Sequence, residues 1–461
     1  MEGLVLPNDL LLLIGEQLSQ HADRWNLLFV CRHFYDLYLP LLYRHVELRN
    51  WRHINSFFHA ITRKRSLARA VRALELNDWN SAVKPPSKQE SQDLKASIVI
   101  KSHVWAYSVD ENEAAVWQRD LVNGLADAWI AVTLPLMTQL RELHLSYDRN
   151  TPHLSRVIQR VINDEHPFHG QHTFQHLQKV SLDLSHDMDE HAYSNTEYAL
   201  LFSSSDIVMP IFNLPSLREF FATGLVDPTS PKMESNNSNN TAFSSITAID
   251  LRESCGNYGM EKLISSCVAL KSFKYQHSDS RLQSLGYRPA EFYRALTRSK
   301  KTLEVLWLDN HGSHHPFTAA GLNQTHEQFF GSLADFSVLH ELRIRLNNLL
   351  DIEFQNEPTT PLLDCLPSSL NSLFIEGCKM RHMSMLAAQI GAVIKSRHTR
   401  FPNLQRIEIE GTVNDRSRSD TEETNDCMPE NTSEVPLVAL PLYLDCVTAG
   451  VDLQFRKFPF S

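Results

Sequence analysis

Apolar residues recur along most of the chain in a short pattern, in which one apolar residue is followed three and five positions later by two more. Alternation at the second and third positions predicts a short strand whose buried side chains share one face. From Leu140 onward, between 24 and 40 residues separate successive copies, whereas the longer interval from Leu74 to Leu143 leaves room for a hidden or replaced repeat. The copies begin at Val71, Leu140, Leu177, Leu217, Ile246, Leu270, Leu303, Leu339, Leu370 and Leu404.

A pattern of this period predicts stacked units rather than one compact core. Helical spacing between the strands, for example over 261–267, 291–297 and 385–394, predicts helices that cover the outer side of the sheet. The run from Leu370 to Cys378 resembles a leucine-rich repeat, in which the ninth position is Asn or Cys. The resemblance implies an α/β fold: an irregular leucine-rich-repeat solenoid with a curved parallel sheet and outer helices. Another α/β arrangement remains the competing interpretation.

The solenoid is expected to span residues 51–435, with insertions where the repeat is interrupted. These insertions are expected at 77–120, 227–241 and 414–434, the last two being polar and of low complexity. Residues 436–461 are expected to form a C-terminal cap, with a helix from about Pro441 and a final strand from Val451.

Residues 1–50 are dense in leucine but are broken by turn-forming residues, which predicts several short helices. The first helix follows Pro7 and is apolar over most of its circumference, so it must be buried on more than one side. A small module cannot supply all of that cover, which predicts a partner protein. A second helix is expected from Asp23, and Pro40 should kink or delimit a third.

This segment resembles the F-box, a three-helix module. The resemblance rests on Leu6-Pro7-x-Asp9-Leu10, on Val30-Cys31-Arg32 with Phe34, and on a Leu-Leu-Tyr close typical of fungal members. It implies docking on the Skp-type adaptor of a cullin-RING ubiquitin ligase, called SCF. The residues that it implies for adaptor binding are Leu6, Pro7, Leu10, Ile14, Leu18, Leu28, Val30, Leu41, Leu42 and Tyr43. The simpler alternative is that these leucines only form the core of an N-terminal cap.

Residues that alternate with the buried positions of the strands should line the concave face of the solenoid. This face mixes both charge signs with aromatic side chains, a combination typical of protein interfaces. We therefore expect a client protein, whose identity the sequence does not indicate, to contact His144, Phe221, Trp307, Asp309, Arg343, Arg345 and Phe374. The alternative is that each aromatic side chain packs locally beneath a loop.

Motifs for catalysis are absent from the sequence: it has no nucleophile elbow, P-loop, H-E-x-x-H or dinucleotide fingerprint. We therefore expect no catalytic residue and no cofactor. We also expect no metal site: His169, His172 and His176 are closely spaced, but Pro167 and Gly170 favour a loop there over a helix that could hold a metal. A net charge of -10 disfavours nucleic-acid binding. Seven cysteines without a CxxC pair favour a reducing compartment, and no apolar run is long enough for a membrane span.

The resemblance and the repeat together predict a non-catalytic substrate receptor of an SCF-type ubiquitin ligase, in the cytoplasm or nucleus, with no membrane partner. Two other functions stay open. The protein could be an F-box scaffold that acts without a cullin, or a leucine-rich-repeat interaction protein whose N-terminal helices are only a cap.

Overall fold

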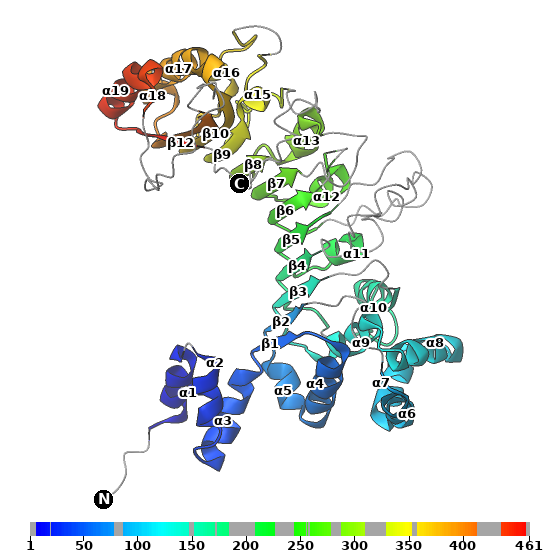
Figure 1. The fold of residues 1–461 in the computed structure, drawn as a ribbon. Coiled ribbons are helices and arrows are strands. Elements are labelled where there is room, and N and C mark those ends of the chain that lie inside the picture. The colour runs from blue at the N-terminus through cyan, green and yellow to red at the C-terminus, as the bar shows by residue number, and fades with distance from the viewer. Residues whose placement is uncertain are drawn as a thin grey trace, which may run out of the picture. The chain divides into compact units, whose positions relative to one another are not determined.

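The computed structural model divides the chain into two compact units, residues 1–223 and residues 224–461. Figure 1 shows the elements of both units by label and colour. The residues that the structure describes are 6–18, 20–77, 86–146, 152–170, 173–183, 208–225, 244–254, 256, 259–277, 287–308, 329–352, 357–412 and 435–457. The predicted polar insertions at 227–241 and 414–434 lie outside them, as do 78–85 of the first insertion.

The first unit begins with three helices and continues with strands separated by helices. Its helices are α1 (Asn8–Gln17), α2 (His21–Leu27), α3 (Arg32–Leu42), α4 (Trp51–Arg63), α5 (Arg65–Ala70), α6 (Lys88–Ala96), α7 (Ile98–Tyr107), α8 (Glu111–Val122), α9 (Ala126–Thr133), α10 (Pro152–Ile162) and α11 (Val208–Phe212). Its strands are β1 (His45–Leu48), β2 (Ala73–Leu76), β3 (Glu142–Ser146), β4 (Lys179–Asp183) and β5 (Glu219–Thr223).

These five strands pair in parallel and in chain order. The register aligns the second apolar position of each repeat, so that Leu74, Leu143, Val180 and Phe220 form one buried row. The first apolar residue of each repeat is buried as well, as at Val71 and three later copies. Each large apolar side chain buried in this way stabilises the fold by about 1.5–3 kcal/mol. The predicted strands of this unit are therefore confirmed, and β1 is an additional one.

Helices α1 and α3 pack against each other through a close approach at Gly15. A Cβ atom at this position would lie 2.5 Å from the Tyr38 ring, so a larger residue would push the helices apart. The Tyr38 hydroxyl donates a hydrogen bond to the main-chain oxygen of Leu11 at 2.7 Å, and Arg44 forms an ion pair with Glu16 at 2.5 Å. These contacts hold the inner side of α1 on α3 and leave its other side outward.

Helices α6 to α9 separate β2 from β3 along the chain, yet the two strands pair directly. The interval between the first two repeats therefore holds no replaced repeat within the sheet.

In this helical segment the Asp127 carboxylate accepts hydrogen bonds from the main-chain nitrogens of His153 and Leu154, at 2.7 and 2.9 Å, and so caps α10. His153, which is buried, also contacts Asp120 at 3.0 Å. Burial raises the pKa of Asp127 to about 6, against the opposing effect of the two main-chain hydrogen bonds.

The second unit alternates strands and helices in the same way. Its strands are β6 (Ala248–Ser254), β7 (Ser272–His277), β8 (Val305–Leu308), β9 (Glu341–Arg345), β10 (Ser372–Lys379), β11 (Arg406–Thr412) and β12 (Asp452–Lys457). Its helices are α12 (Glu261–Ser266), α13 (Pro289–Leu296), α15 (Leu346–Leu349), α16 (Leu362–Cys365), α17 (Met380–Lys395), α18 (Arg397–Arg400) and α19 (Leu440–Ala449). The capping helix and final strand expected after Pro441 correspond to α19 and β12.

Strands β6 to β12 also pair in parallel and in chain order. The predicted ninth repeat position, Cys378, is buried on β10 after a register shift, and it lies opposite Gly411 of β11. A Cβ atom at Gly411 would lie 2.0 Å from the main-chain oxygen of Cys378, so glycine is required there. Both units are thus α/β with parallel strands, as the repeat predicted.

Candidate interaction surfaces

An apolar surface lies on the outer side of α1, opposite its contact with α3. Leu10, Leu13 and Ile14 are 46%, 54% and 49% exposed, and Leu6 precedes them at 42%. Their spacing places them on one side of the helix, one turn apart. This helix therefore has two apolar sides, of which only one is covered by the described residues.

Further exposed apolar residues lie on α2, in the turn after it and on α3. Trp25, Phe29, Val30 and Tyr35 are all exposed, and the Trp25 and Phe29 rings pack edge to face with centroids 5.8 Å apart. We call Leu6, Leu10, Leu13, Ile14, Trp25, Phe29, Val30 and Tyr35 together the N-terminal apolar surface. Exposed apolar groups in such number mark interaction sites on folded proteins.

The structure separates the residues implied for adaptor binding into three groups. Leu6, Pro7, Leu10, Ile14 and Val30 are exposed, whereas Leu18, Leu41 and Tyr43 are half-buried. Leu28 and Leu42 are buried, so here they stabilise the helical module and do not reach its surface. Four exposed residues of this surface were not predicted to bind the adaptor, namely Leu13, Trp25, Phe29 and Tyr35. The helical spacing of Leu13 from Leu6 and Leu10 could have indicated the first of them.

Cys31 has a structural role at the start of α3. It is the residue before the helix, and its sulfur accepts a hydrogen bond from the main-chain nitrogen of Phe34 at 3.5 Å. This contact satisfies one of the main-chain donors that a helix leaves unpaired at its first turn.

A second surface is formed by the outward residues of the strands, and in the first unit it is acidic. The outward carboxylates are Glu47, Glu75, Glu142, Asp183 and Glu219, against Lys179 as the one lysine or arginine at the outward positions of β1–β5. The predicted client residues of this unit, His144 and Phe221, both lie on this face. Lys179 places its ammonium 4.9 Å from the centre of the Phe221 ring, so a cation covers part of this aromatic.

In the second unit the outward aromatic residues lie between charged side chains. The Trp307 ring nitrogen donates a hydrogen bond to Glu341 at 2.7 Å, and the Lys274 ammonium lies 3.5 Å from the ring centre. The Arg343 guanidinium lies 5.5 Å from the same ring on the next strand. Trp307 is therefore half-buried and is held by its neighbours on both strands.

Arg343 joins Trp307 to a group of carboxylates. It forms an ion pair with the buried Glu376 at 2.5 Å and lies 3.9 Å from Glu410. Its guanidinium also covers the Phe374 ring at 4.2 Å, and Phe374 is only 8% exposed. The ring of Phe374 is therefore covered by the protein itself, and its contact with a client stays a prediction.

Glu408 extends this group on the next strand. It pairs with Arg406 at 2.6 Å and with Arg456 at 2.7 Å. Burial raises the pKa of Glu410, and nearby Arg343 opposes that shift. Of the remaining predicted client residues, Arg345 lies half-buried beside Glu376 in the strand register, and Asp309 lies outside the described residues.

The candidate metal-ligating and nucleophilic side chains can be located among the described residues. Among them, no three His, Cys, Asp or Glu side chains lie close enough to hold a metal ion. His169 is an exposed neighbour of Asp164, and His172 lies outside the described residues. Burial raises the thiol pKa of Cys365 and of Cys446 to about 11, which keeps them protonated and weakly nucleophilic at neutral pH.

In the part of the chain that the structure describes, no helix is both long and apolar enough to cross a bilayer.

Two comparisons with known proteins bear on this geometry. A family model described as a leucine-rich repeat domain matches residues 49–423, which is most of the chain. None of the curated proteins matches the chain. The matched segment begins after α1–α3 and covers the strands β2 to β11.

Proposed function

From the premise that this chain belongs to the leucine-rich repeat family, we propose that it is a non-catalytic substrate receptor of a ubiquitin ligase. In this proposal the helices α1 to α3 bind a Skp-type adaptor, and the strand face binds a client protein. The family membership carries only the general part of the proposal, namely a role in protein interaction.

The N-terminal apolar surface is the observation that carries the specific part. Its exposed side chains lie on or beside three short helices whose sequence resembles the F-box. Covering such a surface releases water from apolar groups and contributes about 25 cal/mol for each Å² that is buried. A partner with an apolar groove would therefore gain most of its binding energy from Leu10, Leu13 and Phe29.

The strand face supplies a second surface for the client. In the first unit its carboxylates are mostly exposed, so a client segment rich in Lys and Arg would be favoured there. A receptor of this kind needs no nucleophile of its own. It works by holding the lysines of the client close to the ubiquitin-conjugating enzyme, which raises their effective concentration.

Co-expression with a Skp-type adaptor tests the proposal. We expect the adaptor to co-purify with the full chain and to be lost from the Leu13→Glu/Phe29→Glu variant, because two charges would be buried in an apolar interface. Both positions are exposed, so the substitutions leave the core of the module intact.

Leu437→Glu is the matched control, since Leu437 is an apolar residue that is 89% exposed in the second unit. This variant should retain the adaptor. An adaptor that binds neither the full chain nor the control, or that binds the double variant equally well, would contradict the proposal.

The two alternatives make different predictions for a reconstituted reaction. A substrate receptor supports ubiquitin transfer to a client when cullin, RING protein and conjugating enzyme are added. A scaffold that acts without a cullin binds the adaptor but supports no transfer, and a simple N-terminal cap binds no adaptor at all.

A further inference from the structure

Strand β1 lies at the end of the strand order in its unit and pairs on one side only, with β2. In the observed register the main-chain oxygens of Arg44 and Leu48 accept hydrogen bonds from β2 and the residue after it. The main-chain groups of His45 and Glu47 therefore point away from β2. No described residue forms a hydrogen bond with these groups, and both residues are exposed.

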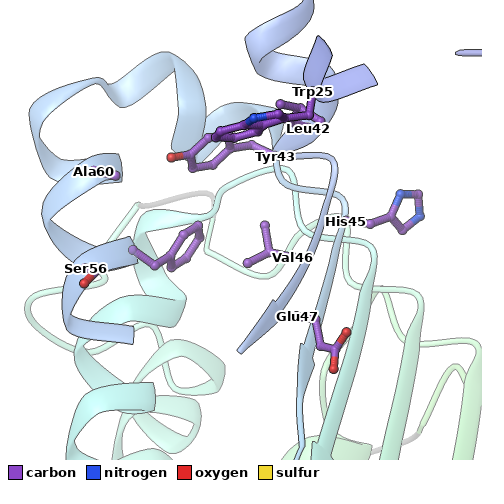
Figure 2. A pocket seen from close by; sticks show the side chains of 9 residues that line it. Trp25, Leu42, Tyr43, His45, Val46, Glu47, Ser56 and Ala60 are labelled. Carbon is purple, nitrogen blue, oxygen red and sulfur yellow. The ribbon is translucent and has the colours of Figure 1, made fainter. Parts of the chain in front are cut away.

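A cavity of about 330 Å³ opens beside this free edge. Trp25, Leu42, Tyr43, Val46, Phe57 and Ala60 line it, together with His45, Glu47 and Ser56. In Figure 2 Val46 projects into the cavity from β1, and His45 points away. The Tyr43 and Phe57 rings are stacked with centroids 6.1 Å apart, so the lining is mainly apolar and aromatic.

We propose that the free edge of β1 and this cavity together bind an extended peptide segment of a partner protein, which adds to the sheet as a further strand. An exposed strand edge is a ready template for such pairing, because it presents a row of donors and acceptors. This inference goes beyond the proposed function. Trp25 belongs both to the cavity lining and to the N-terminal apolar surface, so peptide binding is measured with no adaptor present.

The geometry of the edge defines the chemistry of the peptide. Side chains of the added strand that lie next to Val46 project to the same side as Val46, into the cavity. A large apolar side chain fits there, since a space of this size lined by aromatic groups accommodates one with little rearrangement. The neighbouring side chains of the peptide lie on the opposite side, next to His45 and Glu47.

Charge favours lysine or arginine at these neighbouring positions. Glu47 is exposed there and pairs with Arg49 at 2.8 Å, and the register places the exposed Glu75 beside it on β2. Two carboxylates therefore stand against one arginine at this edge. The preferred ligand is therefore an extended segment with one bulky apolar residue flanked by basic residues.

A library of random 12-residue peptides displayed on phage, selected against the full chain, tests this inference. We expect enriched peptides to share a bulky apolar residue next to Lys or Arg. Synthetic copies of the enriched peptides are then measured by fluorescence polarisation against the full chain and its variants.

Two variants at Glu47 separate main-chain pairing from charge. Glu47→Pro removes an outward N–H and leaves the bonds to β2, and its preceding residue, Val46, already has a strand conformation. We expect it to weaken peptide binding at least tenfold, whereas Glu47→Ala, which keeps the N–H, should weaken it about threefold or less. Ala60→Phe fills the cavity and should also weaken binding at least tenfold.

The peptide itself provides a test that needs no variant to fold. Methylation of the main-chain nitrogens that face β1 should abolish binding, and methylation of the alternate nitrogens should not. Adaptor binding should be unchanged by Glu47→Pro, which separates this inference from the proposed function.

Three results would overturn the inference. They are the absence of any enriched peptide, equal binding to the full chain and to the Glu47→Pro and Ala60→Phe variants, and equal effects of the two methylation patterns. A dimer of the full chain that Glu47→Pro dissociates in sedimentation experiments would assign the edge to a second copy of the chain instead.

Discussion

The strand faces of the two units are built from the same repeat but differ in how their charges are arranged. In the first unit the outward carboxylates outnumber the lysines and arginines by five to one at the outward positions of β1–β5. In the second unit ion pairs join many of the outward charges, and two of its carboxylates, Glu376 and Glu408, are buried. The alternation of the strands thus specifies which side chains point outward but not whether they are available to a partner.

This difference has an energetic reason. A carboxylate that is removed from water must be paired, because an isolated buried charge is strongly destabilising. Arg343 compensates Glu376 in this way, so this part of the second unit depends on its charges for stability. The first unit leaves its carboxylates near water, where they cost little and remain able to attract a basic partner.

The largest expected effect comes from breaking the buried pair. Arg343→Ala should lower the free energy of unfolding of the second unit by about 3 kcal/mol, because it removes the guanidinium that pairs with the buried Glu376 charge. Lys179→Ala, the matched change in the first unit, removes a cation over the Phe221 ring and should cost about 0.5–1 kcal/mol. Denaturant unfolding measures both, and equal losses would contradict the contrast between the units.

A pH effect is expected at Asp127 in the first unit. Its pKa rises from 3.8 to about 6 on folding, so the folded state binds the proton more tightly than the unfolded state does. The stability from this group is fully present below pH 3.8 and is lost as the pH rises through about 6. The component is on the order of 3 kcal/mol, at about 1.4 kcal/mol for each pKa unit.

Asp127→Asn removes this component, since an amide does not titrate in this range. Unfolding measured between pH 4 and pH 7 should therefore show a shallower pH dependence for the variant than for the unsubstituted chain. An unchanged slope would show that the carboxyl group is not buried as the structure has it.

A smaller effect is expected at the aromatic residues of the strand faces. Trp307→Phe loses the hydrogen bond to Glu341 and weakens the contact with Lys274, and should cost about 1–2 kcal/mol. Phe221→Leu in the first unit keeps an apolar side chain and should cost less than about 1 kcal/mol. If Phe221→Leu lowers the free energy of unfolding in urea by more than Trp307→Phe does, the prediction that the Trp307 ring is held more strongly is wrong.

The smallest effect on stability is expected for the exposed carboxylates. Glu219→Gln should change the free energy of unfolding by less than about 0.5 kcal/mol, because its charge is already in water. Glu408→Gln in the second unit is the comparison, and it should be clearly destabilising because both Arg406 and Arg456 lose a charged partner. Thermal unfolding of the two variants in one buffer measures both effects, and an equal loss of stability would contradict the contrast between the units.

Much of the fold was predictable because each repeat buries residues at fixed spacing. Leu143, Phe273 and Ile407 were expected on strands and lie on β3, β7 and β11. Strand β1 was missed although Tyr43, Val46 and Leu48 have the spacing of the repeat, because they directly follow a helical leucine run and Tyr43 was assigned to that run.

The candidate surfaces were harder to predict, since they depend on contacts between residues far apart in sequence. The covering of Phe374 by Arg343 joins positions on neighbouring strands, and no local pattern indicates it. The same holds for Leu28, whose burial is decided by how the three N-terminal helices pack. Spacing alone distinguishes inward from outward positions within one element, and it does not show what another element covers.

Hydrogen exchange of the full chain, measured by mass spectrometry with and without a Skp-type adaptor, tests the central claim most directly. If α1 to α3 are the docking module, main-chain amides within residues 6–44 become protected when the adaptor is added, and those of β9 to β12 exchange at unchanged rates. Protection confined to the strands, or no protection in any peptide at saturating adaptor, would contradict the account.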